Sequence, residues 1–242
     1  MASLPLQAQS DSVSYVFGIG SANILDTYIS PEKYKGSEIR YGSTRIHHYK
    51  QTAWQWHLMY MGNVSFTENR AENVDEIGGE VVVQYAWQHN WTFNKVTLSV
   101  GPAIEGKLGF LYNTRNQNNP AQAEMAINIG PSFSATIPLC KVFNHPLTLS
   151  YDGSMPFFGL MFSPNYGQSY YEIFSKDDYD RNVVPTTFFS TPSYRHSVNF
   201  SIGLKKSNII VGYMGDYQQA KVNNLKYNHF SHLFVIGYSK LF

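Results

Sequence analysis

A strict alternation of side chains between residues 54 and 66 constrains the fold more than any other feature of the chain. One parity is large and apolar, and the other is mostly more polar. The apolar set is Trp54, Trp56, Leu58, Tyr60, Val64 and Phe66, and the facing set is Gln55, His57, Met59, Met61, Asn63 and Ser65. A period of two is the period of a β-strand. Because the facing set is too polar for the dry core of a β-sandwich, the pattern indicates a barrel strand with lipid outside and a polar lumen inside.

The same alternation recurs along the chain and predicts an all-β transmembrane antiparallel β-barrel of about ten strands, with eight or twelve left open. The expected strands lie at 13–20, 37–46, 54–66, 80–87, 96–112, 125–137, 147–161, 195–204, 209–217 and 230–242. Long connections follow the odd-numbered strands, and short ones follow the even-numbered strands. Outer-membrane barrels show this asymmetry, since their periplasmic turns are short and their external loops are long. The long connections are expected at 24–36, 67–79, 113–120, 163–193 and 218–228.

Composition agrees with this fold and argues against two other classes. Charged residues make up 14% of the chain and aromatic residues 16%, which favours β structure next to an apolar phase. The formal net charge of +1 gives no basis for binding nucleic acid. No apolar run reaches the roughly 20 residues of a spanning helix, so a helical membrane protein is excluded. The tryptophans, at 54, 56, 87 and 91, fall near the periplasmic ends of two strands, as in an interfacial aromatic girdle.

Both ends of the chain point to export to the bacterial outer membrane. Residues 1–8 resemble the end of a signal peptide with a small-residue cleavage site after Ala8, so 9–242 is expected to be one barrel domain. The last strand ends on Phe242, as in the assembly signal of outer-membrane proteins, although Lys240 departs from the apolar residue usual there. Outer-membrane lipid and the barrel-assembly machinery are therefore the expected partners. Cys140 is the single cysteine and forms no intramolecular disulfide.

Three short stretches near the N-terminus carry a resemblance to a known family. Residues 15–20 (YVFGIG), 25–31 (LDTYISP) and 34–36 (YKG) are similar to an uncharacterised family of Bacteroidetes outer-membrane barrels, a domain of unknown function. The resemblance implies the fold and the outer-membrane location for most of the chain. It implies no catalytic residue and no cofactor.

Six charged residues fall on the inward parity of the predicted strands. They are Glu80, Glu105, Lys107, Asp152, Arg195 and Asp216. One interpretation is a charged constriction in a narrow solute channel. The other is a lumen filled by paired side chains, which we favour because small barrels leave little aqueous room and ionised groups buried there must pair.

The loop at 163–193 holds the predicted contact residues for an external partner. Tyrosine offers a broad surface at low entropic cost, and the candidates are Tyr166, Tyr170, Tyr171, Glu172 and Tyr179. The sequence thus favours a structural, partner-binding or loop-presenting barrel, alone or within an outer-membrane protein complex.

A lipid-modifying outer-membrane enzyme is the remaining alternative. His196 and His232 fall on the lipid-facing parity, but the nearby Ser197 and Ser231 point inward. A nucleophile needs a base within hydrogen-bond reach, so no catalytic residue is assigned. The other histidines considered are expected in turns, without the ligand spacing of a metal site. They are His47, His48, His89 and His145.

Three prolines, Pro102, Pro131 and Pro156, lie inside predicted strands. A closed barrel has no edge at which a missing N–H is harmless. We therefore expect bulges or lost ladder hydrogen bonds at these positions.

Overall fold

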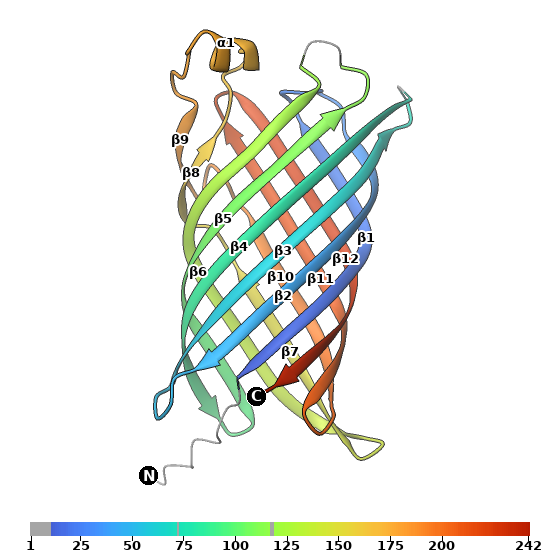
Figure 1. Ribbon diagram of the computed structural model, residues 1–242, viewed down its shortest axis with the longest axis vertical. Helices are drawn as coiled ribbons and strands as arrows, with labels where there is room; N and C mark the ends of the chain where they lie inside the picture. Colours follow the sequence, from blue (N-terminus) through green and yellow to red (C-terminus); the bar gives the residue numbers. More distant parts are fainter. Residues whose placement is uncertain (1–10, 72, 117–118) are drawn as a thin grey trace.

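The structure is a computed structural model that describes residues 11–242 except 72, 117 and 118, so the predicted cleavage site after Ala8 lies outside the described residues. The described chain forms a closed antiparallel β-barrel of ten strands, which confirms the predicted fold class (Figure 1). The elements are β1 (Ser12–Asp26), β2 (Tyr34–His48), β3 (Trp54–Asn69), β4 (Val74–Phe93), β5 (Val96–Asn113), β6 (Ala121–Val142), β7 (His145–Ser154), β8 (Phe158–Phe162), α1 (Tyr170–Ser175), β9 (Val183–Thr187), β10 (Tyr194–Gly203), β11 (Ser207–Val222) and β12 (Leu225–Leu241). The first strand pairs with the last, from Ser12 opposite Leu241 to Asp26 opposite Tyr227.

Twelve strand segments form ten wall positions because two positions are each built from two pieces. Both β7 and β8 pair with β6, one below the other. The second shared position holds β9 and β10. There β9 pairs with β8, and β10 pairs with β7 on one side and with β11 on the other. No helix in the described part of the chain is long and apolar enough to cross a membrane.

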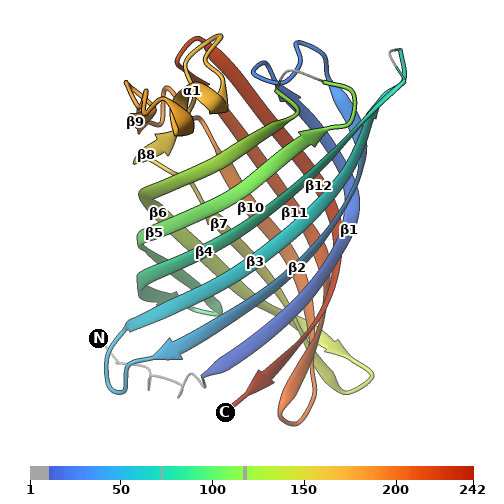
Figure 2. The same ribbon diagram turned by 45° about the horizontal axis from the view of Figure 1, so that its top comes forward.

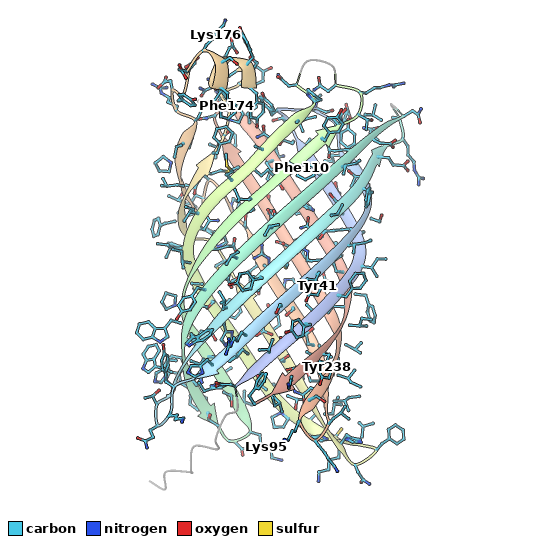
Figure 3. The ribbon with its side chains drawn as sticks, viewed as in Figure 1. Tyr41, Lys95, Phe110, Phe174, Lys176 and Tyr238 are labelled. Carbon is cyan, nitrogen blue, oxygen red and sulfur yellow. The ribbon has the colours of Figure 1, made fainter. Side chains whose placement is uncertain are left out.

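The outer wall is apolar and the inner wall is largely polar, as the alternation predicts. On β12, Phe234, Ile236 and Tyr238 are each about half exposed, whereas Leu233 and Val235, which alternate with Phe234 and Ile236, are at most 2% exposed. Figure 3 shows side chains projecting from the whole outer wall, with Lys95 at the lower end and Lys176 at the upper end. So much exposed apolar surface is stable only against another apolar phase. The parity therefore matches a barrel surrounded by lipid.

Two predicted long loops are wrong in extent, because the strands continue past the lipid-facing zone. Residues 70–73 alone connect β3 to β4, where 67–79 was expected. Only Asn223 and Asn224 connect β11 to β12, where 218–228 was expected, and both have positive φ, as a type I′ hairpin turn requires. Long connections remain at 27–33, 114–120 and 163–182, and all of them lie at one end of the barrel.

The opposite end carries the short turns and an aromatic cluster on the outer wall. The rings of Trp54 and Trp87 lie 5.0 Å apart on neighbouring strands, and His89 is 4.5 Å from Trp91. His47, His48 and His89 are strand residues and His145 begins β7, so their prediction as turn residues was wrong. The imidazole of His47 contacts the carboxylate of Asp11 at 2.5 Å. The backbone N–H of Phe242 donates to the Asp11 carbonyl at 2.9 Å, which ties the C-terminus to the start of β1.

The prolines disturb the wall as expected. Pairing between β4 and β5 stops at Ala86 opposite Ala103 and resumes at His89 opposite Val100, so the two pairs at Gly101 and Pro102 are lost. Glycine is required beside this proline, because a Cβ at Gly101 would lie 1.9 Å from the carbonyl oxygen of Trp87. Pro156 has a larger effect, since it lies between β7 and β8 and divides the strand that was predicted to run unbroken over 147–161.

The stretch predicted as one long irregular loop contains the short hairpin that the sequence left open. Its second strand, β9, pairs with β8 from Phe162 opposite Val183 to Phe158 opposite Thr187. Residues 188–193 then lead to β10 without strand structure. Figure 2 shows β8, β9 and α1 standing together at one side of the rim.

Candidate functional site

A chain of buried ion pairs crosses the upper half of the lumen. The guanidinium of Arg40 donates to the carboxylate of Glu38 at 2.8 Å and to that of Asp216 at 2.6 Å. Asp216 also accepts from Arg195 at 3.1 Å, and Arg195 donates to Glu105 at 2.7 Å. These five side chains come from β2, β5, β10 and β11, so the pairs connect opposite sides of the barrel.

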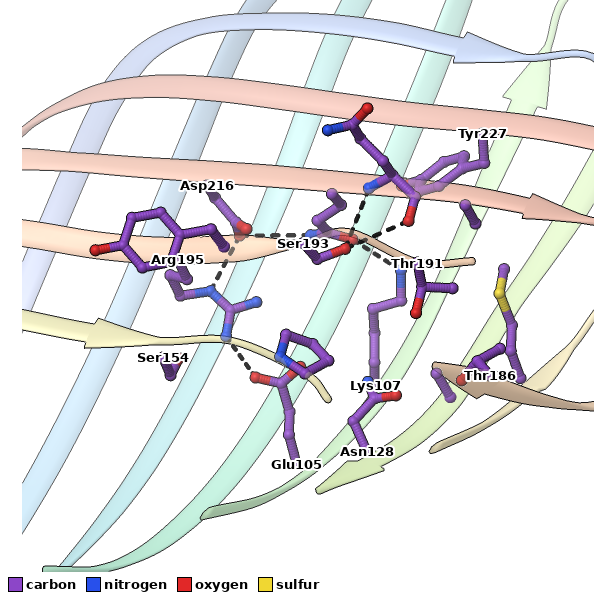
Figure 4. A pocket seen from close by; sticks show the side chains of 17 residues that line it. Glu105, Lys107, Asn128, Ser154, Thr186, Thr191, Ser193, Arg195, Asp216 and Tyr227 are labelled. Carbon is purple, nitrogen blue, oxygen red and sulfur yellow. Dashed lines mark hydrogen bonds and ion pairs between the residues drawn. The ribbon is translucent and has the colours of Figure 1, made fainter. Parts of the chain in front are cut away.

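A second group of paired charges, around Lys107, joins these ion pairs through the side-chain amide of Gln218. The ammonium of Lys107 lies 3.5 Å from Glu80 and 3.1 Å from Glu124, and it donates to the Gln218 amide oxygen at 2.8 Å. The Gln218 amide nitrogen in turn donates to Glu80 at 3.0 Å and to Asp216 at 3.4 Å. Figure 4 shows how Arg195, Asp216 and Lys107 converge here from different strands. The two groups form one continuous network, which we call the lumen network.

The structure brings five of the six predicted lumen residues into the network and leaves one out. Glu80, Glu105, Lys107, Arg195 and Asp216 belong to it. Asp152 lies nearer the turns on β7, opposite Ser134 and Ser197, and makes no ion pair with any described residue.

Sequence reasoning missed four members of the network. They are Glu38, Arg40, Glu124 and His229. Glu38 and Arg40 lie two residues apart on the inward parity of β2, a signal that was present but weak. Glu124 and His229 each lie one residue before the start of a predicted strand, so the predicted strands did not include them.

Burial explains why these charges are paired. The side chains of Glu38, Arg40, Glu80 and Asp216 are at most 3% exposed. An isolated ion would be very costly at such a site, so stability requires partners with good geometry. Ser231 and His229 supply further partners for Glu38, at 2.6 and 2.9 Å. The lumen network thus cross-links strands that are not neighbours in the wall.

An apolar plug covers the network on the side of the long connections. Its buried members are Ile24, Tyr28, Ile29, Leu111, Ala220, Val222, Leu225 and Tyr227. Tyr28 and Ile29 belong to the β1–β2 connection, which folds inward over the lumen because the Asp26 carbonyl accepts from Ile29 and Ser30 at 3.1 and 2.9 Å. The interior is therefore closed by packed apolar side chains above and by paired charges below.

The loop at 163–182 is a folded unit fastened to the barrel. Gln168 donates to the carbonyl of Asp178 at 2.8 Å and accepts from the Asn182 amide at 2.7 Å. The Tyr170 hydroxyl accepts from the backbone N–H of Ala123 at 2.6 Å and donates to Gln122 at 2.8 Å, both on β6. These bonds hold the loop against the rim.

The five predicted contact residues have two different roles in this unit. Tyr166, Tyr171 and Tyr179 are 74%, 65% and 53% exposed. Tyr170 is half-buried and acts as an anchor to β6. Glu172 forms a capping box at the start of α1, where the backbone N–H of Ser169 donates to its carboxylate and holds the pKa of Glu172 below its usual range.

The histidines on the outer wall lie among tyrosines and not beside a nucleophile. The ring of His196 stacks on Tyr194 at 5.1 Å and lies 5.6 Å from Tyr217, and His232 contacts the Tyr213 hydroxyl at 2.7 Å. Ser197 and Ser231 are buried on the other side of the wall, as predicted.

Inside the lumen, Ser231, His229 and Glu38 do meet, but not as a catalytic triad. The same nitrogen of His229, Nε2, faces both the Ser231 hydroxyl at 3.2 Å and the Glu38 carboxylate at 2.9 Å. A triad needs one imidazole nitrogen for each partner. Among the residues that the structure describes, no group of three or more His, Cys, Asp and Glu side chains is arranged to hold a metal ion.

These features define a small transmembrane β-barrel with an apolar exterior and a filled, charge-paired interior. The chain belongs to the family described as "Protein of unknown function (DUF3316)", whose family model matches residues 6–242. This confirms the resemblance to an uncharacterised family, and a Bacteroidetes origin stays a prediction. No curated protein matches the sequence.

Several solved barrel structures align with nearly the whole chain. The transport unit of the autotransporter AIDA-I from Escherichia coli has 9% identity and a TM-score of 0.44, with 100% of this chain and 93% of that chain covered. The translocator domain of the autotransporter NalP from Neisseria meningitidis has 8% identity and a TM-score of 0.46, with coverages of 99% and 91%. The outer membrane protease OmpT from Escherichia coli has 5% identity and a TM-score of 0.47, with coverages of 99% and 99%. At these identities no activity is transferred to this chain.

Proposed function

We propose that the protein resides in the bacterial outer membrane and acts as a non-conducting barrel that displays the loop at 163–182 to a partner outside the cell. The observation that carries this proposal is the construction of the loop, which is folded, anchored through Tyr170 and still exposes three tyrosines. A loop that is ordered before binding loses less entropy when a partner binds.

The chemistry of the exposed loop surface suits a contact role. Tyr166, Tyr171 and Tyr179 add broad amphipathic rings, which bind protein and glycan surfaces at low entropic cost. Phe174 is 57% exposed beside them. The carboxylates of Asp177, Asp178 and Asp180 lie in exposed residues of the same loop, so the surface favours a partner that offers hydrogen-bond donors as well as apolar groups.

Photo-crosslinking on intact cells tests this role. With Tyr171 replaced by benzoylphenylalanine, we expect a covalent adduct of higher mass, because this side chain faces away from the barrel. The same replacement at Tyr170 is a matched control one residue away, where the ring faces β6 and should give no such adduct. If residues 166, 171 and 179 all fail to give adducts in cells that assemble the barrel, the contact role is wrong.

The orientation of the barrel in the membrane can be tested by cysteine labelling. Cys140 is exposed close to the turn that follows β6, at the opposite end of the barrel from α1. A membrane-impermeant maleimide should label Tyr171→Cys in a Cys140→Ser background on intact cells. Wild-type Cys140 should react only after the outer membrane is permeabilised, and the reverse pattern would contradict the proposed orientation.

The alternative function is a narrow solute channel. Conductance measurements distinguish a channel from a non-conducting barrel. We expect the purified protein to carry no sustained single-channel current in planar bilayers, because the apolar plug and the lumen network together leave no continuous polar path. Insertion is verified by the protease resistance of the reconstituted barrel, with a water-filled porin as positive control. Sustained, ohmic currents at moderate voltage would establish the channel.

A further inference from the structure

The barrel wall has one incomplete junction, between the upper part of β11 and the segment that connects β9 to β10. Pairing between β10 and β11 ends at Tyr194 opposite Tyr217. Above that point residues 218–222 of β11 have no strand partner on this side, although their pairing with β12 continues to Val222 opposite Leu225. We call this junction the seam.

Few hydrogen bonds close the seam. The backbone N–H of Lys221 donates to the Ser190 carbonyl at 2.9 Å. The N–H of Gln219 donates to the Ser193 hydroxyl at 3.1 Å, where a barrel strand would offer a backbone carbonyl. A side-chain hydroxyl is easily replaced by another hydrogen-bonding group, so the seam is the part of the described wall that a ligand opens at least cost.

A small cavity of about 50 Å³ lies directly inside the seam. Its lining includes Asn128, Pro156, Thr186, Thr191, Ser193 and Gln219, together with Arg195 and Asp216 of the lumen network (Figure 4). Such a volume has room for roughly three to five water molecules. It therefore fits a small polar group.

Two of the inward-facing lining side chains have no hydrogen-bond partner in the described part of the chain. The hydroxyl of Thr186 and the side-chain amide of Asn128 make no hydrogen bond with any described residue, and Thr186 is only 4% exposed. Buried polar groups are normally satisfied. These groups are thus available to a bound molecule that carries hydroxyl groups.

The lining disfavours a charged group. Arg195 and Lys107 already bind carboxylates, so an incoming anion would also face the carboxylates of Glu105 and Asp216. An incoming cation would face Arg195 and Lys107 instead. The formal charges of the four lining ions sum to zero, since two are basic and two are acidic.

Outside the seam the wall is aromatic and suited to an acyl chain. Phe157, Phe158 and Phe189 are exposed on the β8–β9 side, and Phe188 stacks on Phe157 at 6.1 Å. Tyr194 and Tyr217 lie on the opposite side, at the last pair of β10 and β11. A polar cavity behind an apolar surface matches a molecule with a polar head and an apolar tail.

We propose that the seam and its cavity bind a neutral single-chain amphiphile from the membrane, with a hydroxyl-bearing head group in the cavity and the acyl chain along the outer aromatic surface. The head group bonds to Thr186 and Asn128 and displaces the Ser193 hydroxyl from the backbone N–H of Gln219. This site is separate from the external loop surface, so either proposal can fail without the other.

Native mass spectrometry of the full chain with 1-monopalmitoylglycerol tests the site. In a Cys140→Ser background, Ser190→Cys with Lys221→Cys places a disulfide across the seam. We expect a one-to-one adduct with the wild type and with the reduced double variant, and at least about a tenfold weaker adduct after oxidation. The matched control is Ser21→Cys with Ser37→Cys, an exposed pair directly opposed on β1 and β2, whose oxidation should leave the adduct unchanged.

A second pair of variants keeps the test valid if the disulfide does not form. Ala126→Phe fills the cavity from β6 and should abolish the adduct, whereas Ala135→Phe changes the outer face of the same strand and should not. The proposal is overturned if the wild type binds no monopalmitoylglycerol, or if the oxidised seam variant or Ala126→Phe retains the adduct. Preferential binding of palmitate or lysophosphatidylcholine would overturn the neutral head group.

Discussion

Asp216→Asn is expected to lower the free energy of unfolding by about 3–5 kcal/mol, the usual cost of breaking a buried ion pair from one side. Asp216 accepts from both Arg40 and Arg195, at 2.6 and 3.1 Å. Removal of its charge leaves two buried guanidinium groups short of a carboxylate. Their remaining acids, Glu38 and Glu105, each already serve one of them.

Urea-induced unfolding in phosphocholine vesicles measures this loss. The tryptophans lie at the opposite end of the barrel from the lumen network, so their fluorescence reports global unfolding and not a local change. Asp152→Asn is the matched control, since the same chemical change removes an inward carboxylate that has no ion-pair partner among the described residues. It should leave stability unchanged or raise it. Equal losses in both variants would show that the network contributes no specific pairing.

The wall of the barrel could be predicted because each lipid-facing strand carries its own signal. Trp54 and Phe66 are on one face and Gln55 and Ser65 are on the other, as the alternation requires, and no distant contact is needed to read this. Lys240 fits the last strand in spite of its charge, because it is exposed near the chain end, with its ammonium 5.0 Å from the ring of Phe242.

The strand ends could not be predicted in the same way. Above the lipid-facing zone the outward residues become polar, so alternation fades although the hydrogen-bond ladder continues. Residues 218–228 therefore resemble a loop in sequence, yet they form the top of β11, a two-residue turn and the start of β12. The two asparagines of that turn were the available signal.

The candidate site could also be predicted only in part. Glu105 and Arg195 could be predicted as lumen residues because they lie inside strongly alternating strands. Their pairing could not, because it depends on which strands face each other across the lumen, and this is set by the barrel's closure. The role of Tyr170 as an anchor was equally out of reach, since its partners Gln122 and Ala123 are nearly fifty residues away.

The interior has two layers with different physical origins. The lumen network is held by directional pairs, and its contribution depends on every partner being present. The plug is held by packing, and its contribution scales with the apolar volume that it buries. The second layer can be tested by itself, because the apolar side chain of Ile24 belongs to the plug and takes part in no ion pair or side-chain hydrogen bond.

Ile24→Ala is expected to lower the free energy of unfolding by about 2–5 kcal/mol, since it leaves a cavity among rigid neighbours. Ile24 is fully buried at the top of β1, in the cluster with Tyr28, Leu111 and Leu225. Ile19→Ala is the matched control on the same strand. Ile19 faces outward and is 54% exposed, so lipid fills the space that the substitution leaves and the loss should be clearly smaller.

The same vesicle unfolding assay compares the two isoleucine variants under identical conditions. A larger loss at Ile24 than at Ile19 is the signature of a packed plug, because the two substitutions remove the same atoms from the same strand. Equal losses would mean that the top of the lumen is loosely filled and that lipid contact matters as much as the core. The proposed lack of conductance would then depend on the lumen network alone, and Asp216→Asn would become the variant in which to look for ionic currents.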